Sequence, residues 1–175
     1  MTAVEPMDFS SYTLGTRHDP ILMDRSEDVR SACLALARQA RRSIIITSRQ
    51  LDPLVYNNSD FGVAIRDFAL SSRNARLRIL VSDTGPAIHS GHRLIDLSQR
   101  LSSFIEIRIP DQQQTRYNSA FVVVDSCAYL FREQSDLYAA QCCFGDRKFS
   151  DELSRQFENM WETALPDLNL RRLQI

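Results

Sequence analysis

The sequence predicts an α/β domain in which a mixed β-sheet is flanked by helices. Two features of the pattern lead to this class. In the first two thirds of the chain, segments with apolar residues at helical spacing alternate with short β-branched runs, an order typical of parallel strands joined by crossover helices. In the last third, three strand-like segments follow one another before a closing helix, which adds antiparallel pairs. The 175 residues suffice for one domain with a real core, and 43% of them are hydrophobic.

The N-terminal part is expected to contain an arm, a helix and a strand. Residues 1–25 are mainly polar and are predicted to form an arm before a domain that covers residues 26–175. The helix should have Asp24 or Ser26 as its N-cap, because such side chains accept hydrogen bonds from the free amides of a first turn. Its apolar positions share one face: Val29, Cys33, Leu36 and Ala40. The β-branched run at 43–47 then predicts a buried strand.

The middle of the chain repeats this helix-strand order. Apolar residues at helical spacing predict a second helix at 61–68, and the run at 76–81 predicts the second strand. A third helix is expected from about 87 to 101. Residues 104–109 alternate between apolar and charged side chains, which indicates a half-exposed strand that Pro110 ends.

The last third is expected to hold the antiparallel strands and the closing helix. Strands at 121–124 and 128–131 should be joined by a tight turn at 125–126, with a further strand near 137–144. Because residues 121–124 are apolar without interruption, we expect an interior strand that is buried on both faces. The closing helix has five inward apolar positions before Pro166: Leu153, Phe157, Met160, Trp161 and Ala164.

The motif with the most chemical information is Asn-Ser-Ala-Phe-Val-Val-Val-Asp at 118–125. It resembles the H-x-K-x-x-x-x-D signature of the phospholipase D superfamily, whose histidine attacks a phosphodiester and whose lysine holds the phosphate. Asp125 matches the aspartate, whereas Asn118 stands at the histidine position and Ala120 at the lysine position. Asparagine is a poor nucleophile and cannot carry the proton traffic of an imidazole, and alanine cannot bind phosphate. These three residues are therefore interpreted as a vestigial motif, and no catalytic residue is assigned.

The resemblance extends beyond the motif. The element order across about 26–165 is similar to one lobe of the phospholipase D fold, so the expected architecture is a phospholipase D-like single lobe. Active members carry a Gly-Ser and an Asn after the motif aspartate, where this chain has Arg-Glu-Gln-Ser at 132–135. More narrowly, the chain is similar to an uncharacterised bacterial group of degenerate single lobes, some of them appended to acetyltransferases. Active single-lobe relatives pair two lobes, so the resemblance also implies a homodimer as one arrangement.

Three functional hypotheses follow from these residues. The first is a non-catalytic phospholipase D-like domain that binds a phosphate-bearing ligand, a nucleic acid or a partner protein. The second is a phosphodiesterase or nuclease that uses His89 and His92 in place of the lost motif, which requires these histidines to converge with Asp125 in a cleft. The third is a regulatory module that acts in trans on an acetyltransferase.

The candidate ligand-binding residues are His89, His92, Arg93 and Arg116, and the expected ligand is an anion. Residues 38–116 contain twelve basic and seven acidic residues, a net charge of +5 in a chain of net −1. Twenty of the 21 basic residues are arginine, which suits bidentate phosphate recognition, but the arginine codons of a GC-rich genome are the favoured explanation. A net charge of +5 on this segment is well below the charge of a strongly basic nucleic-acid-binding surface.

The two histidines allow more than one interpretation. At i, i+3 near the start of one helix, His89 and His92 with Arg93 are placed to hold an anion beside free backbone amides. The same pattern fits a solvated polar face, or a metal shared with Asp83 or Asp96. Since no third strong ligand accompanies the pair, we predict no metal and no cofactor.

Two aspartates are also open to structural interpretations. Asp83-Thr84-Gly85 mimics the active-site turn of aspartic proteases, but the alternating helices favour a strand-to-helix turn. Asp125 either orients a partner in the vestigial site or simply makes the hairpin turn with Ser126.

The remaining expectations concern compartment and thiols. Cys33, Cys127, Cys142 and Cys143 are expected to be buried free thiols, with the vicinal pair facing opposite sides of a strand. No apolar run approaches the roughly 20 residues of a membrane helix, and the start of the chain does not resemble a signal peptide. A cytoplasmic protein without membrane association is the natural expectation.

Overall fold

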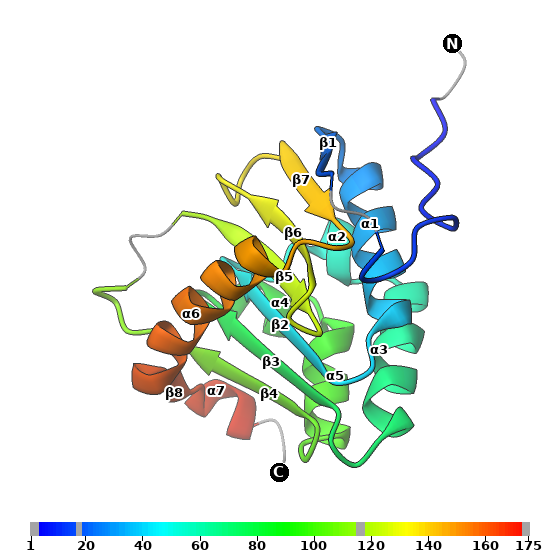
Figure 1. Ribbon diagram of the computed structural model, residues 1–175. Coiled ribbons are helices and arrows are strands. Elements are labelled where there is room, and N and C mark those ends of the chain that lie inside the picture. Colours follow the sequence, from blue (N-terminus) through cyan, green and yellow to red (C-terminus); the bar gives the residue numbers. More distant parts are fainter. Residues whose placement is uncertain (1–3, 17–18, 115–117, 173–175) are drawn as a thin grey trace.

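The computed structural model describes residues 4–16, 19–114 and 118–172, and these form an eight-stranded mixed sheet with helices on both faces (Figure 1). The strands are β1 (Ile21–Met23), β2 (Ser43–Ser48), β3 (Arg76–Val81), β4 (Ile105–Ile109), β5 (Ala120–Val124), β6 (Ala128–Arg132), β7 (Ala140–Cys143) and β8 (Leu165–Pro166). Their order is β1-β7-β6-β5-β2-β3-β4-β8. β2, β3 and β4 are parallel, and the other neighbours pair antiparallel. The predicted fold class is confirmed.

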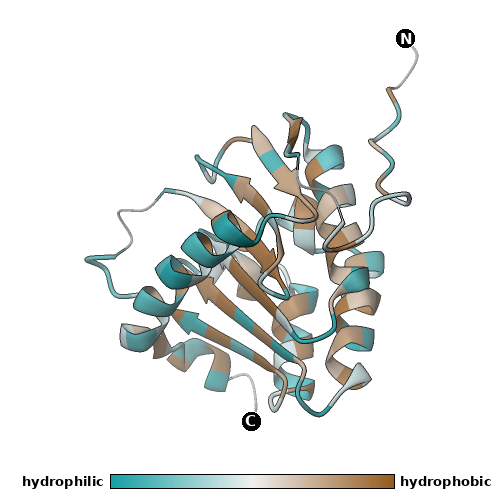
Figure 2. Ribbon diagram, in the orientation of Figure 1, coloured by the Kyte–Doolittle hydropathy of each residue, from teal (hydrophilic) through white to brown (hydrophobic). Residues whose placement is uncertain are grey.

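The helices divide between the two faces of the sheet. They are α1 (Ser26–Gln39), α2 (Pro53–Tyr56), α3 (Ser59–Ser71), α4 (Gly85–His89), α5 (Arg93–Arg100), α6 (Arg147–Thr163) and α7 (Leu168–Arg172). α1, α3 and α5 cover one face, while α6 crosses the other (Figure 1). Figure 2 shows the apolar strands between these layers and the hydrophilic outer side of α6.

Two apolar cores result, one on each face. The larger core contains Val122 and Val124 of β5 together with the inner faces of α1 and α3. The smaller core contains Phe121 and Val123, over which α6 places Phe157 and other apolar side chains. β5 is therefore buried on both faces between β2 and β6, as its unbroken apolarity predicted. Cys142 and Cys143 likewise lie in opposite cores, and all four cysteines are buried free thiols.

The expected helix at 87–101 is wrong as one element. α4 ends at His89 and α5 begins at Arg93, because the chain turns at Gly91 with a positive φ of 67°. Glycine adopts this left-handed conformation at little cost. His89 and His92 therefore do not share a helix face, since His89 ends one helix and His92 caps the next.

The N-terminal segment packs more closely than a polar arm suggests. The N-cap position of α1 is Arg25, without a side-chain hydrogen bond, so neither Asp24 nor Ser26 has the predicted role. Asp28 is buried and instead accepts the Met7 N–H at 2.7 Å. Phe9 packs in the larger core, and the short strand β1 pairs with β7. The further strand is shorter than expected, at Ala140–Cys143. In the part of the chain that the structure describes, no helix combines the length and apolarity needed to cross a membrane.

Candidate functional site

A pocket lies where the carboxyl ends of β2 and β3 meet the start of β5. Because β2, β3 and β4 are parallel and β5 runs antiparallel to β2, one edge of the sheet collects these ends. We call this end of the sheet, where the strands terminate, the site edge; the term does not refer to the outermost strands. Its segments are residues 48–52, 82–84, 110–114, 118–119 and 132–138. Open α/β sheets commonly bind ligands outside the carboxyl ends of their strands.

This site pocket has a volume of about 390 Å³, and eight of its eleven lining residues are polar. The polar lining residues are Thr47, Ser48, Arg49, Ser82, Gln114, Asn118, Ser119 and Ser135. Leu80, Pro110 and Met160 complete it with apolar atoms. A neighbouring hollow of about 430 Å³ shares Ser48, Arg49 and Ser135, so these three residues separate two adjoining spaces.

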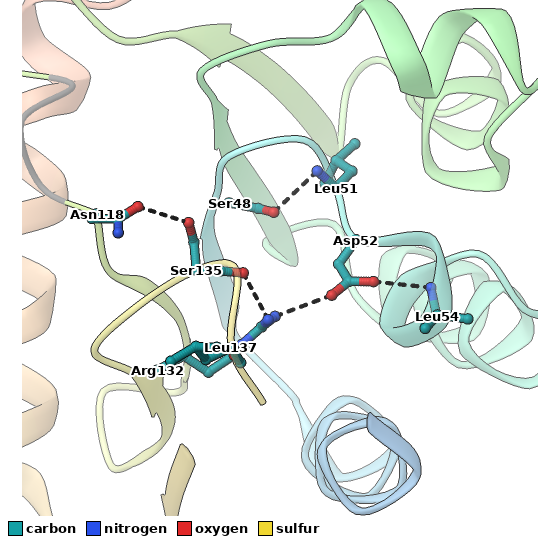
Figure 3. A network of polar contacts seen from close by, with 8 residues as sticks. All are labelled: Ser48, Leu51, Asp52, Leu54, Asn118, Arg132, Ser135 and Leu137. Carbon is teal, nitrogen blue, oxygen red and sulfur yellow. Dashed lines mark hydrogen bonds and ion pairs between the residues drawn. The ribbon is translucent and has the colours of Figure 1, made fainter. Parts of the chain in front are cut away.

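Asn118, at the histidine position of the vestigial motif, is held by the loop after β6. The Ser135 hydroxyl donates to Asn118 Oδ1 at 3.1 Å, and the Ser135 N–H donates to the Asn118 carbonyl at 2.7 Å (Figure 3). Within the described residues, Asn118 Nδ2 has no hydrogen-bond partner, so it is a free donor at the pocket. Ala120 is buried and pairs with Arg132 in the ladder, so its methyl group does not line the pocket.

Arg132 fixes the loop that carries Ser135. Its side chain is only 3% exposed, and its guanidinium donates to the carbonyls of Leu137 and Ser135, each at 2.7 Å. It also pairs with Asp52 at 3.3 Å (Figure 3). The ring of Tyr138 lies 4.8 Å from the guanidinium carbon. Asp52 in turn accepts the Leu54 N–H at the start of α2. Arg132 is thus a structural cation, and the pocket does not use its charge directly.

Arg49 is the exposed cation of the pocket. The preceding Ser48 accepts the Leu51 N–H at 3.0 Å, and Leu51 is buried with a positive φ of 55°. This tight turn directs the chain away from the sheet directly after β2. Among the described residues, Arg49 has no ion pair, so its guanidinium is available to a ligand.

Asp125 lies at the opposite end of β5 from Asn118. Its carboxylate accepts the N–H groups of Arg41, Arg42 and Ser43 at 2.9, 2.7 and 2.9 Å. Asp125 and Ser126 have φ values of 51° and 54°, which is the backbone of a tight hairpin turn. The expected turn is confirmed. The carboxylate fastens this turn to the connection between α1 and β2, seven residues or roughly 23 Å along the chain from Asn118.

His92 is buried and uncharged at neutral pH. Its side chain caps α5, with Nδ1 accepting the Leu94 N–H at 3.1 Å. Burial lowers the pKa of His92 to about 4, and a contact with the backbone of Leu51 opposes part of this shift. The Arg93 N–H donates to Asn57 Oδ1 at 3.1 Å, so the first amides of α5 already have protein partners. The helix start that was expected to hold an anion is therefore filled by Asn57 and His92.

The three candidate anion ligands that the structure describes do not converge at the vestigial motif. His92 and Arg93 line a separate hollow that contains neither Asn118 nor Asp125. His89 is exposed at the end of α4, and Arg116 lies outside the described residues. The convergence that the histidine-based enzyme hypothesis requires is absent from the described residues. Nor do these residues contain a group of three or more His, Cys, Asp or Glu side chains arranged for a metal ion.

The Asp-Thr-Gly segment is a strand-to-helix turn between β3 and α4. Asp83 accepts the Gly85 N–H at 3.0 Å through one oxygen and the Gln50 side chain at 3.0 Å through the other. The Thr84 hydroxyl donates to the buried carboxylate of Asp167, which ties the C-terminal segment to this turn. This geometry agrees with the structural interpretation of the segment.

Comparison with known proteins places the chain in a family. The sequence model described as "Domain of unknown function (DUF7931)" matches residues 25–173. The chain belongs to this family. No curated protein matches it in sequence.

Solved structures show which fold the DUF7931 domain has. It is similar to NucT from Helicobacter pylori, with a TM-score of 0.62 and 11% identity over 85% of this chain and 99% of that one. It is also similar to Nuc from Salmonella typhimurium, a phospholipase D family member, with a TM-score of 0.59 and 12% identity over 85% and 99%. At these identities the likeness shows the fold alone, which is phospholipase D-like.

A third similar structure is TrmBL2, an archaeal chromatin protein whose structure shows a novel mode of DNA binding. The TM-score is 0.64 at 13% identity, over 86% of this chain and 54% of TrmBL2. The DUF7931 domain thus spans about half the length of TrmBL2.

Sequence reasoning missed the residues that make the DUF7931 pocket. Ser48 and Arg49 follow directly after a β-branched strand, which is a signal for the carboxyl-end edge of an α/β sheet. Ser135 could be found only through the motif spacing after Asp125. Its pairing with Asn118 depends on the loop that Arg132 holds, and that contact is not visible in the sequence.

Proposed function

We propose that the protein is a non-catalytic phospholipase D-like domain that binds a small phosphate-bearing ligand in the site pocket. The observation that carries this proposal is the position of Asn118. It occupies the histidine position of the motif and lines the pocket. Its Nδ2 is a free donor among the described residues, while its Oδ1 accepts a hydrogen bond from Ser135. An amide in this place can bind an oxyanion but cannot form a phosphoenzyme.

We expect no phosphodiester hydrolysis because the described lining of the site pocket lacks a suitable nucleophile and a general acid. In the described ranges, no histidine or lysine lines the site pocket, and Arg49 is its one cationic side chain. The lysine position is the buried methyl group of Ala120. Without an activated nucleophile or a general acid, phosphodiester cleavage has no protein group to drive it.

Binding is supported by the donors that converge on the pocket. Arg49 and Asn118 Nδ2 are pure donors, and the hydroxyls of Ser48, Ser82 and Ser119 can add hydrogen bonds. A charge-assisted hydrogen bond contributes about 1.5–3 kcal/mol, so two or three of them give weak binding after association costs. The acidic residues along the site edge disfavour a polyanion, which is why the proposed ligand is small.

Calorimetric titration of phenyl phosphate into the purified protein tests the binding. Arg49→Ala should lower the affinity about tenfold or more, because it removes the charge-assisted bond. The matched control is Arg66→Ala, an exposed arginine that pairs with Asp67 away from the pocket. Equal affinity of the wild type and Arg49→Ala, with measurable binding in both, would reject this site.

Hydrolysis is tested with bis(p-nitrophenyl) phosphate. We expect no release of nitrophenol above the level of a heat-denatured sample. Turnover by the wild type that disappears in His89→Ala would overturn the proposal in favour of the histidine-based enzyme.

A further inference from the structure

A second, strongly charged surface lies at the opposite edge of the sheet, where β2, β3 and β4 begin and β5 and β7 end. Six exposed cations occupy the connections along it, and we call this set the basic edge. Its members are Arg41, Arg42, Arg73, Arg76, Arg147 and Lys148.

Backbone hydrogen bonds show that these connections adjoin one another. The Arg76 N–H donates to the Arg42 carbonyl at 3.1 Å, which joins the starts of β2 and β3. Arg41 and Arg42 bind the Asp125 carboxylate of the hairpin turn through their backbone amides. The Asp146 N–H donates to the carbonyl of Cys127 in the same turn at 2.9 Å, directly before Arg147 and Lys148. The cations thus line one continuous edge.

The charge of the basic edge is not neutralised locally. Six arginines elsewhere in the domain pair with carboxylates: Arg25–Glu27, Arg66–Asp67, Arg78–Glu158, Arg100–Asp96, Arg108–Glu106 and Arg132–Asp52. Throughout the described ranges, no member of the basic edge has such a pair.

The two carboxylates in the same connections are already engaged by backbone amides. Asp125 accepts three of them, and Asp146 accepts the Phe149 N–H as the N-cap of α6. Residues 41–42, 73–76, 125–127 and 146–148 together contain six cations and two carboxylates, a formal charge of +4.

We propose that the basic edge binds the phosphate backbone of nucleic acid. Neighbouring strands lie about 4.8 Å apart, so a row from β7 to β3 extends over about 20 Å and faces several phosphates at once. Arginine forks match phosphate oxygens, and five of the six cations are arginine. Arg76 also lies over the ring of Phe104, at 5.8 Å, which keeps this side chain near the edge.

The recognition is of the backbone and not of bases. Phe104 is half-buried and covered in part by Arg76, and Phe144 is fully buried, so no stacking platform is open in the described part of the edge. Binding is therefore insensitive to base sequence and strongly dependent on salt.

Fluorescence anisotropy with a labelled oligonucleotide of about 20 nucleotides, single-stranded and as a duplex, tests this proposal. Arg41→Ser/Arg42→Ser and Arg147→Ser/Lys148→Ser each remove two cations and keep the backbone amides that bind Asp125. Each pair should lower the affinity about tenfold at about 50 mM salt. It should also reduce the slope of log affinity against log salt by about 1.4 for the single strand and about 1.8 for the duplex. Arg66→Ser/Arg100→Ser removes two exposed, ion-paired arginines and should change neither value.

The same assay distinguishes this surface from the site pocket and from other partners. Arg49→Ala should leave oligonucleotide affinity unchanged. A tenfold loss of this affinity in that variant would show that the oligonucleotide does not bind at the basic edge. No binding by the folded wild type at about 20 mM salt would overturn the proposal. If polyglutamate of the same total charge competed as well as unlabelled oligonucleotide, the proposal would be overturned in favour of an acidic protein partner. If the same double serine substitutions weakened binding to phosphatidylcholine vesicles that contain phosphatidylserine by an equal factor, the proposal would be overturned in favour of a lipid surface.

Discussion

The site edge and the basic edge lie at opposite ends of the same strands, and they differ in the charge that they present to an anion. The segments of the site edge hold the cations Arg49 and Arg132 against five carboxylates, a formal charge of −3. Those carboxylates are Asp52, Asp83, Asp111, Glu133 and Asp136. The basic edge carries +4, although the same strands connect the two edges. The site edge can select a ligand by hydrogen-bond geometry, whereas the basic edge attracts by charge.

Arginine therefore has two separate uses in this protein. Arg132 is buried and holds a loop through carbonyls and Asp52, so its removal should act on stability. The arginines of the basic edge are exposed and without carboxylate partners in the described residues, so their removal should act on binding. The predictions below test this division, from the largest effect on stability to the smallest.

Arg132→Ala should lower the free energy of unfolding by about 3–5 kcal/mol. It leaves Asp52, whose side chain is only 18% exposed, without its counter-ion, and two loop carbonyls lose their donor. Urea denaturation measures the change, and Arg66→Ala is the control, with an expected loss below about 1 kcal/mol. Equal losses in the two variants would show that Arg132 does not hold the site edge.

Acid should weaken the fold through His92. Its pKa is about 4 in the folded chain, and the ordinary value is 6.5. Between these values the unfolded chain binds more protons, so the stabilisation is present above about pH 6.5 and is lost as the pH falls towards 4. We expect a loss of about 2 kcal/mol over this window.

Denaturation at pH 7 and pH 4.5 in the wild type and His92→Asn measures this effect. Asparagine keeps an N-cap acceptor but does not titrate, so the pH-dependent loss should shrink in the variant. An identical loss in both proteins would assign the acid sensitivity to other groups.

Asp125→Ala should cost about 1–3 kcal/mol, because three backbone amides lose their acceptor at the hairpin turn. Thermal unfolding compares it with Asp111→Ala, whose carboxylate accepts a single local N–H from Gln113. Since Asp125 lies at the basic edge, the variant should leave phenyl phosphate binding at the site pocket intact. Loss of that binding in a folded variant would show that the two edges are coupled.

Arg41→Ser/Arg42→Ser should change the free energy of unfolding by no more than about 0.5 kcal/mol, despite its effect on oligonucleotide affinity. Both side chains are exposed, and the bonds to Asp125 come from the backbone. Chemical denaturation measures this directly. A loss as large as that of Arg132→Ala would remove the distinction between the two classes of arginine.

The sequence predicted the parts of the molecule that local patterns decide. The β-branched runs located β2, β3 and β5 because burial on a sheet face selects such residues, and Asp125-Ser126 located the hairpin turn. Gly91 was not recognised as a break because helical spacing continues on both sides of it. The short strands β1 and β8 exist through pairing with distant β7 and β4, which no local signal reveals.

The two functional surfaces were beyond local patterns for the same reason. Asn118 was identified from motif spacing, but its contact with Ser135 and its proximity to Arg49 depend on the sheet order. The basic edge joins residues as distant in sequence as Arg41 and Lys148, so the local density of charge did not indicate it. His92 was expected to be a cationic ligand because burial is not visible in a spacing of two histidines.

The most direct measurement of the central claim is calorimetric titration of phenyl phosphate into the wild type and Asn118→Asp, with phenol release followed in parallel. Aspartate has the shape of asparagine and keeps the acceptor for Ser135, but it replaces the free Nδ2 donor with an anionic oxygen. The account predicts binding without phenol release in the wild type and no detectable binding in the folded variant. Equal binding by both proteins, or phenol release by the wild type, would contradict it.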